Sequence, residues 1–448
     1  MPQHLKDEFS SLSKIAAPAV LAQLAHMSMG VIDTIMAGHL GAEALASVAT
    51  GVNLFAPPML FILGVFLALN PICAQHNGAK RYQNISLTVQ NALWFAAIIS
   101  IPVFLLWRHL YVVMDWLGVQ PAIKPLARDY LDALSWGTPF YWGFLALRFC
   151  NEGLFANRAV MWCYFSAIPL NIFFNYSFIY GKFGFPELGA VGVGYATSCV
   201  WLFLFAVLLV YTINAKRHRH LHLFAQFHRP QWPLFKELLS IGTPMGLAFG
   251  MEVLMFCMMG LMMATYDTTT AAAHQVALNF ASMSFMVPLG IADAITARVG
   301  FAIGEGSPKG VQHAGQTGIL LAVCCMSVSA TIMIFFPGVV TSIYTEDIGV
   351  QTIAISFLFL AGIFQFSDGL QVSASGALRG MKDTRFPMLI SLTAYWIIGF
   401  PAGWLFAHYT SLGAAGYWAG MICGLSTAAV LLNWRFYVLS HSWHPTRC

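Results

Sequence analysis

Long apolar stretches follow one another along almost the whole of this chain, separated by short polar connections. About twenty apolar residues are enough for a helix to cross a lipid bilayer. Twelve stretches reach that length, with approximate limits at residues 12–38, 46–73, 89–112, 129–151, 160–181, 189–213, 238–265, 271–302, 315–336, 351–375, 386–408 and 413–437. Only 9% of the residues are charged, against about 25% in soluble domains, so lipid must cover much of the surface. The sequence therefore predicts an all-α, polytopic membrane protein with twelve transmembrane helices.

The positively charged residues predict how these helices are oriented. If the N-terminus lies in the cytoplasm, all but four of the 22 Lys and Arg residues fall on the cytoplasmic side; the four exceptions are Arg108, Lys124, Arg128 and Lys182. Cytoplasmic loops of membrane proteins carry an excess of Lys and Arg. Both termini are therefore expected in the cytoplasm.

The two halves of the sequence resemble each other. Pro18 aligns with Pro244, and Gly64 aligns with Gly290. Further matching pairs are Asn53 with Asn279, Asn157-Arg158 with Thr384-Arg385, and Leu188–Gly192 with Leu412–Gly416. Because six helices per half is an even number, both halves enter the membrane from the same side. This arrangement predicts two six-helix lobes related by a pseudo-two-fold axis along the membrane normal, an architecture found in transporters.

The repeat also predicts the limits of the lobes. Residues 1–213 form the first lobe, residues 214–236 a basic cytoplasmic linker, and residues 237–448 the second lobe. Four histidines in the linker could bind a metal, but a solvated basic linker is the simpler interpretation; they are His218, His220, His222 and His228.

Three carboxylates, Asp33, Glu252 and Asp368, lie deep inside apolar stretches, and no Lys or Arg is expected at comparable depth. A charge at the centre of a bilayer costs several kcal/mol. Each carboxylate is therefore expected to be protonated, to bind a metal cation or to face a cationic substrate. Asp293 is a weaker candidate, because it lies five residues from Arg298 near the end of its stretch, where an ion pair is equally expected.

Further polar residues cluster in the first half. His26 and Asp33 are seven residues apart and Asn171 and Asn175 are four apart, so each pair shares one face of a helix. Thr197 lies in the next apolar stretch. These side chains predict an oxygen-rich pocket, although hydrogen bonding between helices is the alternative.

The apolar composition also favours certain ligands and excludes others. The chain contains 21 Met and 36 Phe residues, which suit a surface that accepts many apolar cations, although most of them are expected to pack ordinarily. Phe364 and Phe366, just before Asp368, are possible cavity-lining residues. There is no phosphate-binding loop, no catalytic elbow and no basic stripe with interleaved aromatics. ATP, nucleic acid and enzymatic activity are therefore not expected.

Taken together, several stretches resemble the multidrug and toxic compound extrusion (MATE) family, and in particular its NorM branch of bacterial efflux pumps. They are Pro18–Gln23, Val31–Gly38, Glu152–Leu154, Asn171–Gly181, Ala273–Phe280, Arg298–Gly300 and Ser375–Arg385. The likeness runs over nearly the whole chain. Two features depart from the family pattern: the segment Phe155–Met161 lacks a proline often found there, and Asp293 stands where a small uncharged residue is usual.

The resemblance implies two lobes around a central cleft, and export of drugs and toxic organic cations in exchange for Na⁺ or H⁺. It places the protein in the bacterial inner membrane, with a role in antibiotic resistance, no cofactor besides the coupling ion, and a monomer sufficient for transport. By position, Asp33 matches the acidic residue of the first helix, and Asn171, Asn175 and Thr197 match the polar cluster of the first lobe. Glu252 and Asp368 match carboxylates tied to cation coupling, including a tentative Na⁺ site, and Gln275 matches a residue facing the second cavity.

Three alternatives remain at this point. A flippase for lipid-linked intermediates in the same superfamily would need Lys or Arg in its cavity and would typically have two more membrane spans. A major-facilitator carrier would carry a Gly-x-x-x-Asp-Arg-x-Gly-Arg loop, whereas the corresponding loop here is Asn77–Tyr82. A channel would want a ring of carboxylates, whereas these lie on different helices. The sequence leaves open the substrate spectrum and the choice between sodium and protons.

Overall fold

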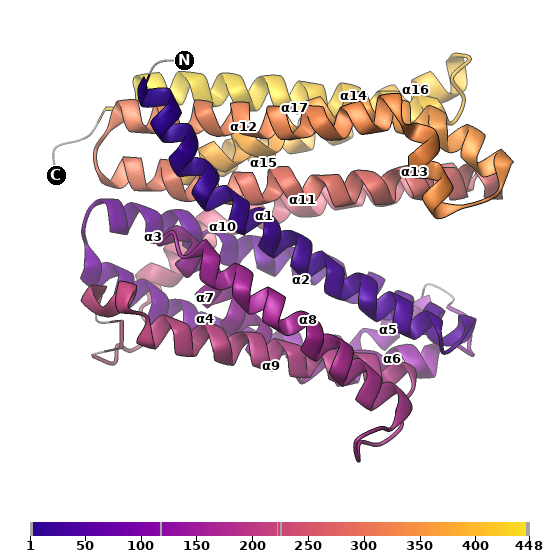
Figure 1. Cartoon of the computed structure of the whole chain (residues 1–448), viewed down its shortest axis with the longest axis horizontal. Coiled ribbons are helices and arrows are strands. Elements are labelled where there is room, and N and C mark those ends of the chain that lie inside the picture. Colours follow the sequence, from indigo (N-terminus) through magenta and orange to yellow (C-terminus); the bar gives the residue numbers. More distant parts are fainter. Residues whose placement is uncertain (1–2, 117–118, 222, 225, 445–448) are drawn as a thin grey trace. The chain divides into compact units, whose positions relative to one another are not determined.

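The computed structural model describes residues 3–116, 119–221, 223–224 and 226–444, and in these ranges it contains helices and no strand (Figure 1). Contacts divide the chain into two compact units. The first lobe is Leu24–Gly242, and the second lobe is Met1–Gln23 together with Thr243–Cys448. The sequence predicted two lobes that are each continuous in the chain, separated by a linker at residues 214–236. The units defined by contacts are not both continuous, because Met1–Gln23 belongs to the second lobe.

The first lobe contains six membrane-spanning segments, some of them built from two helices. They are the latter part of α1 (Gln3–Gly38), α2 with α3 (Ala42–Leu67, Leu69–Gly78), α4 with α5 (Tyr82–His109, Tyr111–Trp116), α6 with α7 (Lys124–Ser135, Thr138–Gly153), α8 (Asn157–Tyr180) and α9 (Ala190–Asn214). A short 3₁₀ helix, η1 (Lys216–Leu221), follows α9.

The second lobe also contains six segments. They are α10 (Trp232–Ala264), α11 (Thr268–Gly304), α12 with α13 (Pro308–Phe335, Pro337–Tyr344), α14 (Ile348–Gly380), the run α15–η2–α16 (Arg385–Leu392, Thr393–Gly399, Phe400–Tyr409) and α17 (Ala415–Ser442). The middle element of that run, η2, is a π-helix. Helix α14 is the most extensively packed of the set, with α11, α12 and α17 against it.

Ten of the segments are long and apolar enough to cross a membrane by length and composition alone. The other two are α6–α7 and α8, and both carry polar side chains inside the lobe. The break between Ser135 and Thr138 shortens α7, which also holds a buried Arg148. Helix α8 holds the buried amides Asn171 and Asn175. These buried polar side chains lower the apolar character of α6–α7 and α8.

Helices α1 and α10 each pass from one lobe to the other. In the second lobe, α11 packs so tightly on α1 that a Cβ added to Gly290 would lie 2.6 Å from Val20 Cα. In the first lobe, a Cβ added to Gly242 of α10 would lie 2.5 Å from Val65 Cα of α2. Gly64, next to Val65, is the repeat counterpart of Gly290. The two crossings are therefore equivalent in the repeat, and each requires a glycine.

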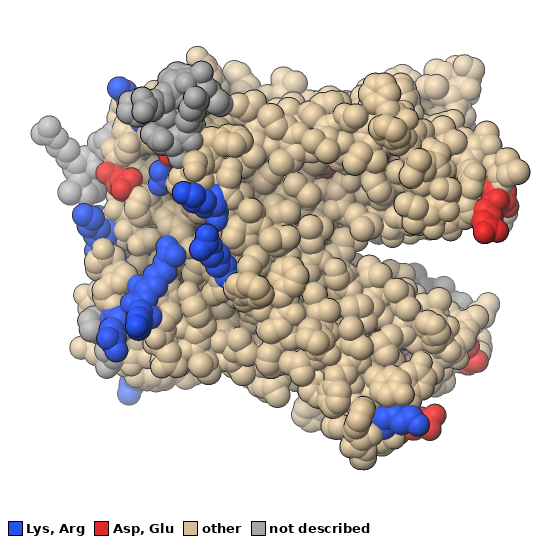
Figure 2. Space-filling model, in the orientation of Figure 1, with Lys and Arg blue, Asp and Glu red and all other residues tan. Residues whose placement is uncertain are grey.

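Most of the surface seen in Figure 2 carries no Lys, Arg, Asp or Glu, and the charged side chains in view lie toward the helix ends. Large apolar side chains are exposed along the helices, for example Ile101 at 66% and Trp162 at 67%. A soluble protein rarely exposes apolar surface on this scale. This surface fits a lipid environment.

Candidate functional site

A carboxylate of α1 lies among neutral polar side chains in the first lobe. Asp33 Oδ1 accepts hydrogen bonds from Asn171 Nδ2 at 2.9 Å and from Asn175 Nδ2 at 2.6 Å. Thr197 Oγ1 of α9 lies 3.5 Å from the other oxygen, Asp33 Oδ2. Asn171 and Asn175 point the same way because they are one turn apart on α8. The structure thus brings together four of the five residues that the sequence grouped, all except His26, while their role stays a prediction.

The Asp33 cluster has a chemical property that matters for ion binding. Its hydrogen-bond partners Asn171, Asn175 and Thr197 are neutral amides and a hydroxyl, so none of them cancels the negative charge. Asp33 itself is only partly buried, whereas Asn171 and Asn175 are buried. The amides hold Oδ1 in place, and Oδ2 accepts a longer hydrogen bond of 3.5 Å from Thr197 Oγ1.

A second polar group in the first lobe was not foreseen from the sequence. Arg148 Nε lies 2.8 Å from Glu152 Oε1, one turn further along α7, and both side chains are buried. Arg148 Nη1 donates to the hydroxyl of Tyr164 at 2.9 Å, and the His26 ring lies 5.4 Å from the Tyr164 ring. His26 therefore joins this ion-pair group and not the Asp33 cluster. The i, i+4 spacing of Arg148 and Glu152 was the available sequence signal.

In the second lobe, two of the predicted carboxylates are electrostatic neighbours. Glu252 of α10 and Asp368 of α14 interact with each other and with Tyr395. Asp368 is 2% exposed and its Oδ1 has no hydrogen-bond partner, nor does the hydroxyl of Tyr395. Gln371, one turn after Asp368, lies beside Glu252, and its Oε1 also lacks a partner. These oxygens form a concentrated set of unsatisfied acceptors.

Tyr395 was missed by sequence reasoning. It lies in the π-helix η2, which extends from Thr393 to Gly399. Such insertions in a helix are frequent at functional sites because they re-aim side chains. A single tyrosine in an apolar stretch does not indicate a π-helix, because formation of the π-helix depends on packing against other helices.

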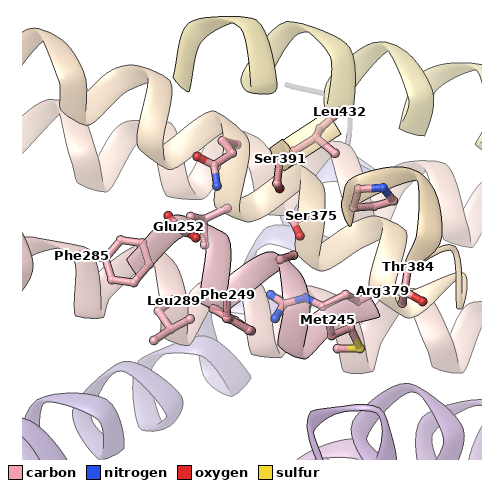
Figure 3. Close-up of a pocket in the computed structure, with 14 residues that line it drawn as sticks. Met245, Phe249, Glu252, Phe285, Leu289, Ser375, Arg379, Thr384, Ser391 and Leu432 are labelled. Atoms are coloured by element: carbon pink, nitrogen blue, oxygen red, sulfur yellow. The ribbon is translucent and has the colours of Figure 1, made fainter. Parts of the chain in front are cut away.

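A pocket opens beside Glu252 in the second lobe (Figure 3). Its walls combine apolar side chains with charges of both signs and several hydroxyls. The lining residues are Met245, Ala248, Phe249, Glu252, Phe285, Leu289, Gln371, Val372, Ser375, Arg379, Thr384, Pro387, Ser391 and Leu432. An aromatic and aliphatic cavity with a few convergent polar groups is typical of a small-molecule site.

The expectation that no Lys or Arg would be placed as deeply as the carboxylates is wrong in terms of burial. Arg148 and Arg379 are each 4% exposed. Arg148 is tolerated because Glu152 neutralises it, and Arg379 interacts electrostatically with Asp293 and Glu252. In the sequence, both arginines lie near the ends of apolar stretches. Their burial by other helices cannot be predicted from those stretches alone.

Asp293 and Arg298, which the sequence suggested as a boundary pair, each contact helix α1. Arg298 binds Glu8 of α1 through two hydrogen bonds of 2.7 and 2.8 Å. Asp293 Oδ2 accepts a hydrogen bond of 3.1 Å from Gln23, also on α1. Both contacts attach the start of α1 to α11 inside the second lobe.

The remaining candidates lie outside the Glu252 pocket. Phe364 is buried against Phe256 and Trp418, so it belongs to the core of the second lobe. Phe366 and Gln275 are exposed and do not line this pocket. None of the three lies in the pocket that holds Glu252.

The linker is only partly solvated. His218 in η1 is 3% exposed and packs against Tyr211, and burial lowers the pKa of its ring below the usual range. His220 is exposed and contacts Tyr82, whereas His222 lies outside the described residues. In the described part of the chain, no three His, Cys, Asp or Glu side chains are grouped closely enough to hold a metal ion.

Comparison with protein families gives one match over most of the chain. The sequence profile of the MatE family matches residues 18–177 and 244–405. The two matched segments cover one stretch in each half, as the internal repeat predicts. The polar positions Asp33, Asn171 and Glu252 lie within them.

Solved structures share the fold. The eukaryotic MATE transporter AtDTX14 matches with a TM-score of 0.86 and 22% identity, over 97% of this chain and 96% of that chain. An outward-facing multidrug resistance MATE family transporter of the MOP superfamily matches with 0.88 and 19% identity, over 97% of both chains. A MOP superfamily transporter from Pyrococcus furiosus matches with 0.87 and 20% identity, over 97% and 96%. The predicted all-α fold with two six-helix lobes is confirmed.

Proposed function

Because the chain belongs to the MatE family of membrane transporters, we propose that it is a secondary antiporter, which exports amphipathic organic cations in exchange for sodium ions or protons. It is a multi-pass membrane protein and not an enzyme. Membership of this family excludes the major-facilitator alternative. The NorM branch, the bacterial inner membrane and cytoplasmic termini are parts of the same proposal, the termini on the basis of the Lys and Arg distribution.

One observation supports the proposal above the others. The Asp33 carboxylate lies in a membrane helix, and its hydrogen-bond partners are Asn171, Asn175 and Thr197, all of them neutral. A carboxylate in such a place is costly unless a proton or cation joins it. Asp33 is therefore suited to load and release a cation during each cycle.

The second lobe offers a second acidic site of different composition. Sodium is a hard cation and, like calcium and magnesium, prefers oxygen ligands. Glu252, Asp368 and the partnerless oxygens of Gln371 and Tyr395 supply a donor set of this kind. We assign this set to the coupling ion, sodium or a proton, and the adjoining pocket to the drug.

Coupling follows if the cation and the drug compete for the same negative charge. A ligand shifts a conformational equilibrium only through its different affinities for the two states. A sodium ion or proton that arrives at Glu252 or Asp368 removes the charge that holds a cationic drug. Release of the drug on one side of the membrane is then linked to entry of the ion from that side.

The flippase alternative needs positive charge in the cavity to bind a pyrophosphate. Two arginines are buried, but Arg148 is bonded to Glu152, and Arg379 faces the carboxylates of Asp293 and Glu252. Each positive charge is therefore matched by at least one negative charge in its own lobe. This balance favours cationic cargo over a doubly charged anionic lipid.

The test is efflux from proteoliposomes that contain the purified protein. A fluorescent organic cation is loaded, and sodium and pH gradients are imposed independently of each other. We expect drug movement only when at least one gradient is present, and saturation at high drug concentration. Leakage that is independent of both gradients and does not saturate would contradict the proposal.

A further inference from the structure

The pocket beside Glu252 contains a buried guanidinium that cation export does not require. Arg379, in the last turn of α14, is 4% exposed and lines the pocket. Its Nε has no hydrogen-bond partner. In Figure 3 the guanidinium of Arg379 extends toward Phe249, whose ring centroid lies 6.0 Å from Arg379 Cζ, with Ser375 on the same wall. A buried donor without an acceptor is costly, and a bound ligand with an acceptor would remove that cost.

The internal repeat shows why this arginine differs from its counterpart. When Asn157-Arg158 is aligned with Thr384-Arg385, Glu152 falls on Arg379 and Arg148 falls on Ser375. In the first lobe the two positions form a closed ion pair of 2.8 Å. In the second lobe the position one turn before Arg379 holds a serine, which has no charge. The acid that would close an equivalent pair within the helix is missing.

We propose that Arg379 binds the anionic end of zwitterionic substrates, while Glu252 binds their cationic end. This rests on the proposed function and specifies the substrate class of that same pocket. A guanidinium offers a planar fork of donors that matches a carboxylate, and such charge-assisted bonds are about twice as strong as neutral ones. The hydroxyls of Ser375, Thr384 and Ser391 line the same pocket and can complete the hydrogen bonds of an anion.

The rest of the pocket fits the body of such a molecule. Phe249, Phe285 and Leu289 provide aromatic and aliphatic walls between the charged groups. An amphipathic compound with an amine at one end and a carboxylate at the other would bury its apolar core there. A simple cation would use Glu252 and the apolar walls but would be repelled by Arg379. The two classes of ligand should therefore respond to Arg379 in opposite directions.

The experiment uses two dyes that differ in one group. A rhodamine methyl ester is a cation, and the corresponding free acid is a zwitterion with the same ring system. Binding of each dye to the purified full-length protein is measured by fluorescence polarisation. We expect Arg379→Gln to weaken binding of the free acid by about tenfold or more and to leave binding of the ester unchanged or tighter, since one charge-assisted contact and one repulsion are removed. Arg379→Lys keeps the positive charge but not the planar fork, so it should restore only part of the lost binding of the free acid.

A second variant guards against misfolding of the first. Ser375→Ala removes a pocket hydroxyl without changing the charge, and it should weaken binding of the free acid by about threefold, more than it weakens binding of the ester. Equal losses for both dyes in Arg379→Gln would assign Arg379 a structural role and overturn the inference. So would a wild-type protein that binds the ester but not the free acid. Failure of the wild type to bind even the ester would instead count against the proposed function.

Discussion

Among single residues, we propose that the carboxylates inside the helices bind the coupling ion. Asp33 is fixed by two amides, and Asp368 is almost fully buried with an unsatisfied oxygen. Removing the charge while keeping the shape should abolish coupling and spare the fold, because a buried charge does not favour folding. This separation of function from stability makes the carboxylates suitable for testing.

The first prediction concerns Asp368. Asp368→Asn should reduce cation-coupled efflux by about tenfold or more, because an amide cannot bind the ion that shifts the conformational equilibrium. Drug resistance of cells at matched protein level is the measurement. Asp347→Asn is the matched control: Asp347 is an exposed N-cap of the same helix, and Asn caps a helix as well as Asp. Full drug resistance in cells that carry Asp368→Asn would show that Asp368 is not part of the coupling site.

The second prediction concerns Asp33. In Asp33→Asn the remaining oxygen can still accept from Asn171 and Asn175, but the side chain no longer titrates. The pH dependence of efflux should therefore become flatter, measured as initial rates across a pH series. Asp115→Asn serves as control, since Asp115 forms an exposed pair with Lys124. An unchanged profile for Asp33→Asn would leave this residue as a helix-packing hydrogen bonder.

At the scale of helices, the crossings of α1 and α10 are the most constrained elements. Gly290→Ala should destabilise the protein by about 1–3 kcal/mol, because the new methyl group overlaps the backbone of Val20. Gly250→Ala in α10 is the control, since a Cβ there meets nothing within 4 Å. Thermal unfolding in detergent measures both. Equal melting temperatures for the two variants would show that α1 shifts to accommodate the new methyl group.

The linker provides a prediction of pH dependence. Burial lowers the pKa of His218 in the folded state, so the unfolded linker binds more protons as pH falls below about 6.5. Docking of η1 is therefore favoured above that pH and weakened below it. Trypsin cleavage in the linker, relative to His218→Phe at the same pH, should rise on acidification. The same change at the exposed His39, which lies outside the linker, should not alter the pH dependence of cleavage; if it does, the effect does not come from burial of His218.

The positions of the helices could be predicted from the sequence, but their irregularities could not. Apolar length predicted the segments, and the four-residue spacing of Asn171 and Asn175 predicted their common face. It did not predict the π-helix that aims Tyr395, or the burial of Arg379, because both depend on packing between helices distant in sequence. Local patterns report which face of a helix is polar, but not which other helix meets that face.

In the molecule as a whole, each lobe contains an acidic site within its membrane-spanning helices. The scarcity of exposed charge seen in Figure 2 agrees with a protein that lies mostly in lipid. The sites in the two lobes are built differently, with one carboxylate among amides in the first lobe and two carboxylates beside a pocket in the second. The two lobes therefore share one arrangement of helices but contain sites of different chemistry.

We propose that the coupling cation and the drug exclude each other. This is tested by equilibrium binding of a fluorescent cationic drug to the purified protein, across a sodium titration at constant ionic strength and fixed pH. Drug affinity should fall as sodium rises, or fall on acidification if protons are the coupling ion, and sodium affinity should fall reciprocally with drug. Changing Glu252 to Gln and Asp368 to Asn together should remove that dependence. A drug affinity that is flat in both sodium and pH would show that the cation and the drug do not compete.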